Sequence, residues 1–181
     1  MAAEAYGADW IGFIMAPSRR RITPAKARMI CRHLTRVQRV GVFVDAPLTL
    51  VREMAEYCGF DRVQLHGRET ADYCEALGLP YVKSLLMSRL LPASAEWAAY
   101  KNGCFLVDSG SGSGETFDWG QCEKLPDAVR RNMLLGGGLN AGNVAQAIQL
   151  VEPLGVDVSS GVETNGVKDL EKIAAFIRNA R

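Results

Sequence analysis

The sequence predicts an α/β fold in which parallel strands build a TIM-type (βα)8 barrel. Short apolar runs alternate with amphipathic segments from one end of the chain to the other. Parallel strands covered by helices are typically continuous apolar runs, which is the pattern seen here. Seven such strand–helix units are visible, with no linker between them. The 181 residues are therefore expected to form one βα-barrel domain that is a single unit short of eight.

Each expected strand ends in small or polar residues and is followed by an expected helix. The strands are Trp10–Met15, Arg39–Val44, Arg62–His66, Tyr81–Leu86, Cys104–Asp108, Met133–Leu135 and Gly155–Val158. The helices are Pro24–Leu34, Leu48–Tyr57, Glu69–Leu77, Ala93–Tyr100, Trp119–Leu125, Ala141–Val151 and Val167–Asn179. An open flavodoxin-like sheet is the alternative, but it usually has about five strands, so seven units favour the barrel.

The residues before the first visible strand, Ala2–Ala8, are expected to be the end of a helix. A barrel would place a strand before that helix, so we expect the first barrel strand to be missing from this chain. The strands at Trp10 and Gly155 would then each have an unpaired edge. A start assigned too late, a trimmed chain and a natural loss are three explanations that stay open.

The composition favours a soluble cytoplasmic protein with a substantial core. Hydrophobic residues make up 48% of the chain, and a net charge of +1 does not favour nucleic acid or a membrane surface as partner. No segment resembles a transmembrane helix or a signal peptide. The five cysteines and two histidines do not cluster, so no metal site is expected. The thiols are predicted to be reduced and buried.

Two glycine-rich turns late in the chain predict a phosphate site. The segments Leu134–Leu139 and Val156–Gly161 each pass from an apolar strand into glycine and small residues, and each is followed by a helical pattern. Backbone N–H groups that no side chain covers suit a phosphate group. In barrels of this type the last two strand-to-helix loops often hold such a ligand.

The carboxyl ends of the other strands carry candidate catalytic groups. Asp108 closes an apolar strand, where a raised pKa would suit a general acid; a solvated aspartate that caps the next loop is the alternative. The polar, glycine-rich segment Ser109–Thr116 is expected to be a lid. The guanidinium group of Arg20 suits a carboxylate, although a solvated basic loop is also possible. Asp45 is expected to cap a helix, and His66 either hydrogen-bonds within the rim or acts on substrate.

Four longer strings occur in order along the chain: Val63–Gly67, Gly112–Trp119, Leu135–Asn140 and Asp157–Glu163. Together they resemble the motifs of the phosphoribosylanthranilate isomerases, (βα)8-barrel enzymes of tryptophan biosynthesis. The resemblance covers essentially the whole chain. It implies an Amadori rearrangement of N-(5-phosphoribosyl)anthranilate to 1-(2-carboxyphenylamino)-1-deoxyribulose 5-phosphate. No metal or organic cofactor is implied.

The resemblance also implies roles for individual residues. Asp108 would be the general acid, and Arg20 would bind the anthranilate carboxylate. The residues implied in phosphate binding are Gly137, Gly138, Ser160 and Gly161. The residues implied in the lid are Gly112, Ser113 and Gly114. None of the five cysteines matches the family's general base, a cysteine on the first strand. We therefore expect this chain to turn over substrate about 10²–10⁴-fold more slowly than a version that carries the missing strand.

Two other functions stay open. A non-catalytic phosphate-binding barrel, or one fragment of a complementing assembly, would share the glycine turns but not the reaction. A neighbouring barrel such as indole-glycerol-phosphate synthase would need lysine–glutamate pairs at several strand ends, where Lys83 is the one lysine present. The expected partner is a small phosphorylated substrate, and the protein is expected to be a monomer or a homodimer.

Overall fold

The protein is described by a computed structural model that covers residues 2–86, 99–108 and 117–181. The chain divides into two compact units, residues 1–84 with 99–103 and residues 85–98 with 104–181. Strands and helices alternate along the described residues, and the seven strands of the main sheet follow one another in chain order. This alternation confirms the predicted order of strands, with ends that differ by a few residues.

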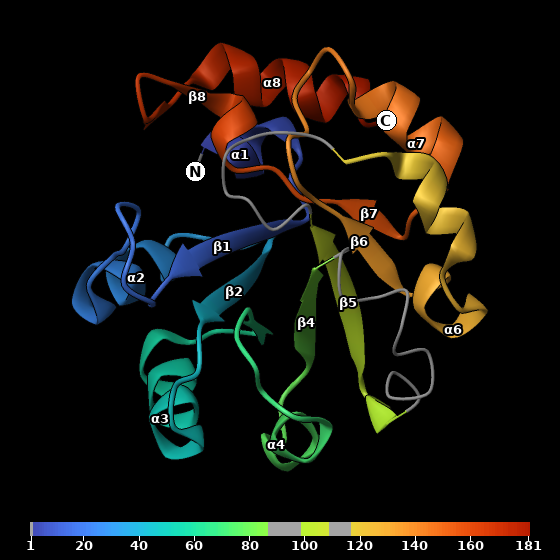
Figure 1. Ribbon diagram of the computed structural model, residues 1–181. Helices are drawn as coiled ribbons and strands as arrows, with labels where there is room; N and C mark the ends of the chain where they lie inside the picture. Colours follow the sequence, from blue (N-terminus) through green and yellow to red (C-terminus); the bar gives the residue numbers. More distant parts are fainter. Residues whose placement is uncertain (1, 87–98, 109–116) are drawn as a thin grey trace. The chain divides into compact units, whose positions relative to one another are not determined.

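The first unit contains strands β1 to β4, which pair in parallel with their neighbours. Its elements are α1 (Ala2–Tyr6), β1 (Trp10–Ile14), α2 (Pro24–Cys31), β2 (Gln38–Phe43), α3 (Leu48–Cys58), β3 (Arg62–Leu65), α4 (Ala71–Ala76) and β4 (Tyr81–Leu86), whose last two residues belong to the second unit. Helices α2, α3 and α4 lie outside these strands (Figure 1). Buried apolar residues such as Val63 and Leu65 fill the space between the layers.

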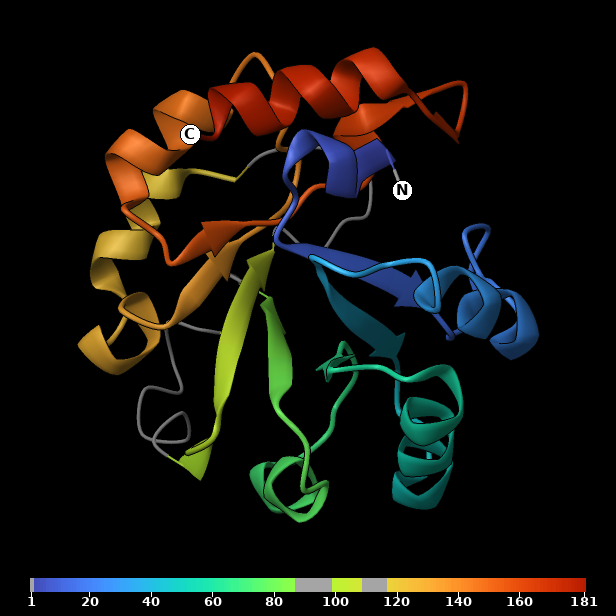
Figure 2. The ribbon, with the colours of Figure 1, turned by 180° about the vertical axis from the view of Figure 1, so that it is seen from behind.

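The second unit contains three parallel strands, β5 to β7, and a short antiparallel hairpin. Its elements are β5 (Gly103–Asp108, whose first residue belongs to the first unit), η2 (Trp119–Lys124), α6 (Asp127–Arg130), β6 (Met133–Leu135), α7 (Val144–Val151), β7 (Gly155–Val156), η3 (Ser160–Val162), β8 (Glu163–Thr164), β9 (Val167–Lys168) and α8 (Leu170–Asn179). Helix α7 contacts both η2 and α8, and Figure 2 shows α7 and α8 end to end.

Some of the expected helices differ from those in the structure. The helix predicted from Val167 starts only at Leu170, because Asp169 accepts hydrogen bonds from two amides of its first turn and Val167 belongs to β9. The helix predicted over Trp119–Leu125 is a 3₁₀ helix. Most of the helix predicted over Ala93–Tyr100 lies outside the described residues.

A buried ion pair connects β4 with the carboxyl ends of β2 and β3. The Lys83 ammonium group donates to Glu69 Oε2 at 2.9 Å, to the Gly67 carbonyl at 2.7 Å and to the Leu65 carbonyl at 3.2 Å. The two carboxylate oxygens of Glu69 accept from the amides of Asp45 and Gly67. Both charged side chains are almost fully buried. Every proton of the ammonium group therefore has an acceptor, which makes burial of the charge tolerable.

Asp45 does not cap a helix, so that prediction was wrong. Pro47 stands at the N-cap of α3, and no side chain caps this helix. Instead, Asp45 Oδ1 accepts from the Arg68 amide at 2.6 Å, which joins the loop after β2 to the loop after β3. A Cβ at Gly67 would lie 2.3 Å from the same oxygen, so this close approach requires glycine.

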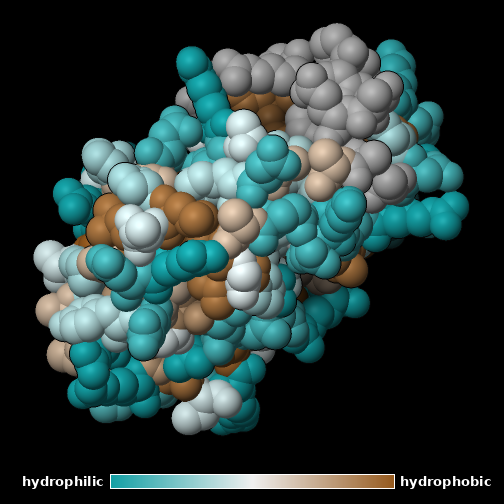
Figure 3. Space-filling view, turned by 90° about the horizontal axis from the view of Figure 1, so that it is seen from below, coloured by the Kyte–Doolittle hydropathy of each residue, from teal (hydrophilic) through white to brown (hydrophobic). Residues whose placement is uncertain are grey.

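Hydrophilic residues cover most of the face shown in Figure 3, and apolar residues form small separate patches on it. The exposed large apolar side chains, such as Met29 and Leu154, come from different elements. Over the described residues, none of the helices has the length and apolar character needed to cross a bilayer.

Replacement of Glu69 by glutamine is expected to lower the free energy of unfolding by about 3–5 kcal/mol, because the Lys83 ammonium group would stay buried without its counter-charge. Urea denaturation measures this change. Combining Glu69→Gln with Lys83→Met should restore part of the loss. Asp127→Asn is the control, since Asp127 forms exposed ion pairs with Arg130 and Arg131, and it should change stability by less than about 1 kcal/mol. Equal effects of Glu69→Gln and Asp127→Asn would contradict the prediction.

Candidate functional site

Two aspartates and a glycine are aligned at the carboxyl ends of β5, β6 and β7. Val107 pairs with Leu135, and Leu135 pairs with Val156. The ladder continues one step further, because the Gly136 amide donates to the Val107 carbonyl and the Asp157 amide donates to the Leu135 carbonyl, both at 2.8 Å. Asp108, Gly136 and Asp157 are therefore neighbours at one edge of the sheet, with the glycine in the middle.

The middle position has little room for a side chain. A Cβ on Gly136 would lie 3.1 Å from Leu106 Cδ1 and 3.6 Å from Asp108 Oδ2. The Asp108 carboxylate thus lies over the face of Gly136 on which a side chain would stand. Both aspartates are partly exposed, so a ligand can reach them.

The environment of Asp157 makes it a titrating group. Burial and the negative charge of Asp108 raise the pKa of Asp157 to about 6, although the ammonium group of Lys168 acts in the opposite direction. A carboxyl group that changes its protonation near neutral pH, beside a second carboxylate, is suited to proton transfer. This strand edge therefore has the groups for acid–base chemistry.

The turn after β6 presents backbone amides without covering side chains. Gly137 and Gly138 both have positive φ, 82° and 67°, a conformation that favours glycine. Within the described part of the chain, neither amide donates a hydrogen bond. The Gly138 carbonyl, in contrast, accepts from Asn143 Nδ2 at 3.1 Å and Asn140 Nδ2 at 3.5 Å. The amides of this turn are available to an anion.

The turn after β7 packs directly against the turn after β6. A Cβ on Gly161 would lie 1.9 Å from the Leu139 carbonyl oxygen and 3.1 Å from the Asn140 Cα atom. Any larger residue at 161 would force the two turns apart. The turn with Ser160 and Gly161 therefore lies against the residues that directly follow Gly137 and Gly138, and a phosphate site shared by these four residues stays a prediction.

The remaining candidates lie elsewhere. Arg20 belongs to the first unit, in the loop between β1 and α2, where its amide donates to Ser18 Oγ at 2.9 Å. His66 Nδ1 is 3.2 Å from Gln64 Nε2 at the end of β3, which fits one of its two predicted alternatives, a hydrogen bond within the rim. The predicted lid residues Gly112, Ser113 and Gly114 lie outside the described residues.

All five cysteines are buried, and none forms a disulfide, as predicted. Four lie in helices: Cys31, Cys58, Cys74 and Cys122. Burial raises the pKa of Cys31 to about 11 and that of Cys74 to about 12, so these thiols stay protonated at neutral pH. Cys104 lies near the start of β5, at the opposite end of the strand from Asp108. Cys104 is therefore not placed to act as a base beside Asp108.

Sequence reasoning missed the groups that hold the two turns in place. Lys168 donates to the Ser159 carbonyl, and Asn143 donates to the Gly138 carbonyl. The Asn165-Gly166 pair was an available signal for the hairpin that carries Lys168, because this dipeptide favours a two-residue turn with positive φ at both positions. Among the described residues, no three His, Cys, Asp or Glu side chains gather as a metal site requires.

Replacement of Asp157 by asparagine is expected to stabilise the protein at neutral pH by about 1–2 kcal/mol, because it removes a negative charge that the site disfavours. Because the pKa is raised in the folded state, the free energy of unfolding of the native protein falls as the pH rises from 3.8 to about 6. The gain should therefore shrink as the pH falls below about 6 and vanish below about pH 3, where the carboxyl group is protonated in both states. Urea denaturation across this range provides the measurement, and a gain that does not depend on pH would count against the assignment.

Replacement of Gly161 by alanine is expected to lower the free energy of unfolding by about 1–3 kcal/mol, because the new Cβ would overlap the Leu139 carbonyl. Gly12→Ala is the control, since a Cβ there would lie 3.7 Å from Val42 Cγ2, an ordinary contact. Thermal and urea denaturation of both variants provide the comparison. Equal stabilities of the two variants would show that the turns do not pack as described.

Comparison with known proteins agrees with this geometry. The family profile described as "PRAI: N-(5'phosphoribosyl)anthranilate (PRA) isomerase" matches residues 2–179. The N-(5'-phosphoribosyl)anthranilate isomerase of Desulforamulus reducens is 44% identical, and the alignment covers 100% of this chain and 88% of that protein.

Solved structures show the same similarity. The phosphoribosyl anthranilate isomerase of Thermus thermophilus superimposes with a TM-score of 0.87 and 38% identity, over 98% of this chain and 90% of that one. A phosphoribosyl anthranilate isomerase in complex with reduced 1-(o-carboxyphenylamino)-1-deoxyribulose 5-phosphate gives a TM-score of 0.81 and 35% identity, over 99% of this chain and 90% of that one. The predicted barrel fold class is confirmed, and the chain belongs to the N-(5'-phosphoribosyl)anthranilate isomerase family.

Proposed function

We propose that this protein isomerises N-(5'-phosphoribosyl)anthranilate in tryptophan biosynthesis, with Asp108 as the general acid. The main support is the alignment of Asp108 with Gly136 and Asp157, directly before the glycine turn at Gly137 and Gly138. A sugar phosphate bound at that turn would bring its ribose to the two carboxyl groups. Membership of the isomerase family supports the same reaction.

The phosphate group is assigned to the two packed turns, at Gly137, Gly138, Ser160 and Gly161. The amides of Gly137 and Gly138 supply donors that have no acceptor among the described residues, and the close contact of Gly161 with Leu139 joins the second turn to the first. Amide donors of this kind stabilise a phosphate without any lysine or arginine in the turn itself. The ligand phosphate thereby anchors the ribose at a constant distance from Asp108.

The reaction needs two protons delivered, to the ring oxygen and to C1′, and two removed, from C2′ and from its hydroxyl group. In the proposed first step, Asp108 donates a proton to the ribose ring oxygen, the bond from C1′ to that oxygen breaks, and the nitrogen lone pair forms a Schiff base at C1′. Loss of a proton from C2′ then gives the enolamine. Protonation of the enolamine at C1′ and loss of the hydroxyl proton at C2′ give the ketone. A positioned general acid typically contributes about 10²–10⁴-fold to such a step.

Two further assignments belong to this proposal. Arg20 binds the anthranilate carboxylate, since its planar guanidinium group can donate two parallel hydrogen bonds to a carboxylate. The family resemblance implies that Gly112, Ser113 and Gly114, which lie outside the described residues, act as a lid over the phosphate. Both assignments rest on the motifs that these residues share with the family.

The alternative function of a neighbouring barrel such as indole-glycerol-phosphate synthase, which would need an accessible lysine at a strand end, has little support. Lys83, within β4, uses its ammonium group to bind Glu69 and the carbonyls of Leu65 and Gly67. It is 3% exposed, so a substrate has almost no access to it.

Replacement of Asp108 by asparagine is expected to lower kcat by about 10²–10⁴-fold while the affinity for reduced 1-(o-carboxyphenylamino)-1-deoxyribulose 5-phosphate changes little. The amide keeps the shape of the side chain but cannot donate the proton as an acid. Turnover is followed by the fluorescence of the substrate, and affinity by calorimetry. Asp127→Asn, at an exposed position on α6, is the control and should behave as the unchanged protein. Wild-type turnover by Asp108→Asn would refute the role of Asp108.

A further inference from the structure

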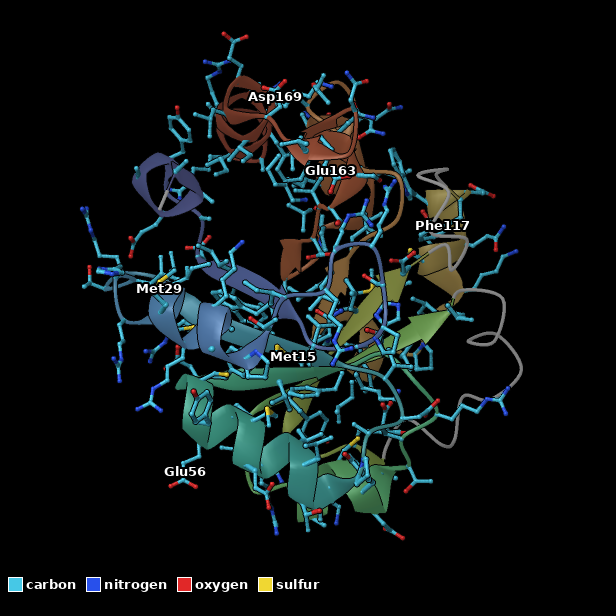
Figure 4. All side chains as sticks on the ribbon, turned by 90° about the vertical axis from the view of Figure 1, so that its left-hand side faces the viewer. Met15, Met29, Glu56, Phe117, Glu163 and Asp169 are labelled. Carbon is cyan, nitrogen blue, oxygen red and sulfur yellow. The ribbon has the colours of Figure 1, made fainter. Side chains whose placement is uncertain are left out.

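The hairpin of β8 and β9 is fastened to the turn after β7 by a single lysine. Lys168 Nζ donates to the Ser159 carbonyl at 2.8 Å and lies 3.0 Å from Glu163 Oε1. The side chain of Glu163 is only 5% exposed, so one carboxylate oxygen keeps the ammonium group in place from the neighbouring strand. Glu163 and Asp169, at the two ends of the hairpin, are labelled in Figure 4.

The contact with the Ser159 carbonyl has a direct consequence for the next amide. In a trans peptide the C=O and N–H groups of one plane point in opposite directions, and the described chain contains no cis peptide bond. The Ser159 carbonyl shares its peptide plane with the Ser160 amide. A donor that holds this carbonyl on one side therefore fixes the Ser160 N–H on the other side.

We propose that Lys168 is a positioning residue of the phosphate site, which orients the Ser160 amide by holding the Ser159 carbonyl. This inference rests on the proposed function, which assigns the phosphate to the turns at Gly137–Gly138 and Ser160–Gly161. Lys168 acts through the backbone and not by contact with the ligand. Its ammonium group is directed to protein acceptors, the Ser159 carbonyl and Glu163.

The first glycine turn is held in the same way. Asn143 Nδ2 donates to the Gly138 carbonyl at 3.1 Å, and Asn143 Oδ1 accepts from the Asn140 amide at 2.8 Å. Each turn thus has a side-chain donor on the carbonyl face of its peptide, supplied from a later residue of the chain. By the same peptide geometry, the Asn143 donor on the Gly138 carbonyl fixes the direction of the Leu139 N–H, the next amide of that turn.

A matched control is available in the same hairpin. Lys172 Nζ donates to the Glu163 carbonyl at 2.8 Å, so it also joins a lysine to a backbone carbonyl of the C-terminal segment. That carbonyl does not belong to either glycine turn. A general effect of removing a lysine from this surface would appear equally in Lys168→Met and Lys172→Met.

The experiment compares two ligands by calorimetry: reduced 1-(o-carboxyphenylamino)-1-deoxyribulose 5-phosphate and the same compound without its phosphate. Lys168→Met should weaken binding of the phosphorylated ligand by about three- to tenfold, the effect of one hydrogen bond, and leave the other ligand unchanged. Lys168→Arg, which keeps a charged donor, should restore most of the affinity. Lys172→Met should bind both ligands as the unchanged protein does.

The outcomes separate the two proposals. If the unchanged protein binds both ligands equally, the phosphate site itself is wrong. If it prefers the phosphorylated ligand and Lys168→Met keeps the full preference, only the role of Lys168 is overturned. Equal weakening of both ligands by Lys168→Met, or failure of Lys168→Arg to restore affinity, would also overturn it. Unfolding midpoints of the three variants show whether any of them has lost its fold.

Discussion

Parallel pairing of β5, β6 and β7 decides where each proposed catalytic and binding group of the second unit lies. Because the three strands point the same way, their carboxyl ends form a single edge, and Asp108, Gly136 and Asp157 occupy equivalent steps of one hydrogen-bond ladder. The glycine turn begins at the next residue. A shift of one step in this register would exchange the inward and outward faces of the strands and separate the carboxyl groups from the turn.

Repulsion between two carboxylates and stabilisation by a lysine act together at this strand edge. Asp157 is held beside Asp108, where its negative charge is disfavoured, and the nearby ammonium group of Lys168 relieves part of that strain. The same lysine holds the Ser159 carbonyl. One side chain thus contributes both to the charge of the carboxyl pair and to the conformation of the neighbouring turn. Active sites commonly retain such unfavourable groups because the reaction needs them.

The sequence was sufficient for the strand order and for the alignment of functional groups at strand ends, because both follow from apolar runs that stop at polar residues. It was insufficient where a tertiary contact overrides a local signal. Asp45 precedes a proline at a helix start and was expected to cap that helix, yet it bonds to Arg68 in the next loop. Val167 fits a helical apolar pattern, but the Asn165-Gly166 turn pairs it with Thr164 in a hairpin. Lys168 showed no signal of its role, since its partner is a backbone carbonyl.

The placement of the cysteines has a consequence for how this chain withstands oxidants. Thiolates, not thiols, react with peroxide, and burial raises the pKa of Cys31, Cys58, Cys74 and Cys122. These sulfur atoms are therefore shielded both by protonation and by their neighbours while the native packing persists. Peroxide would reach these thiols only in molecules whose helices have unfolded. Oxidation to sulfenic acid would therefore modify unfolded molecules and leave the folded enzyme intact.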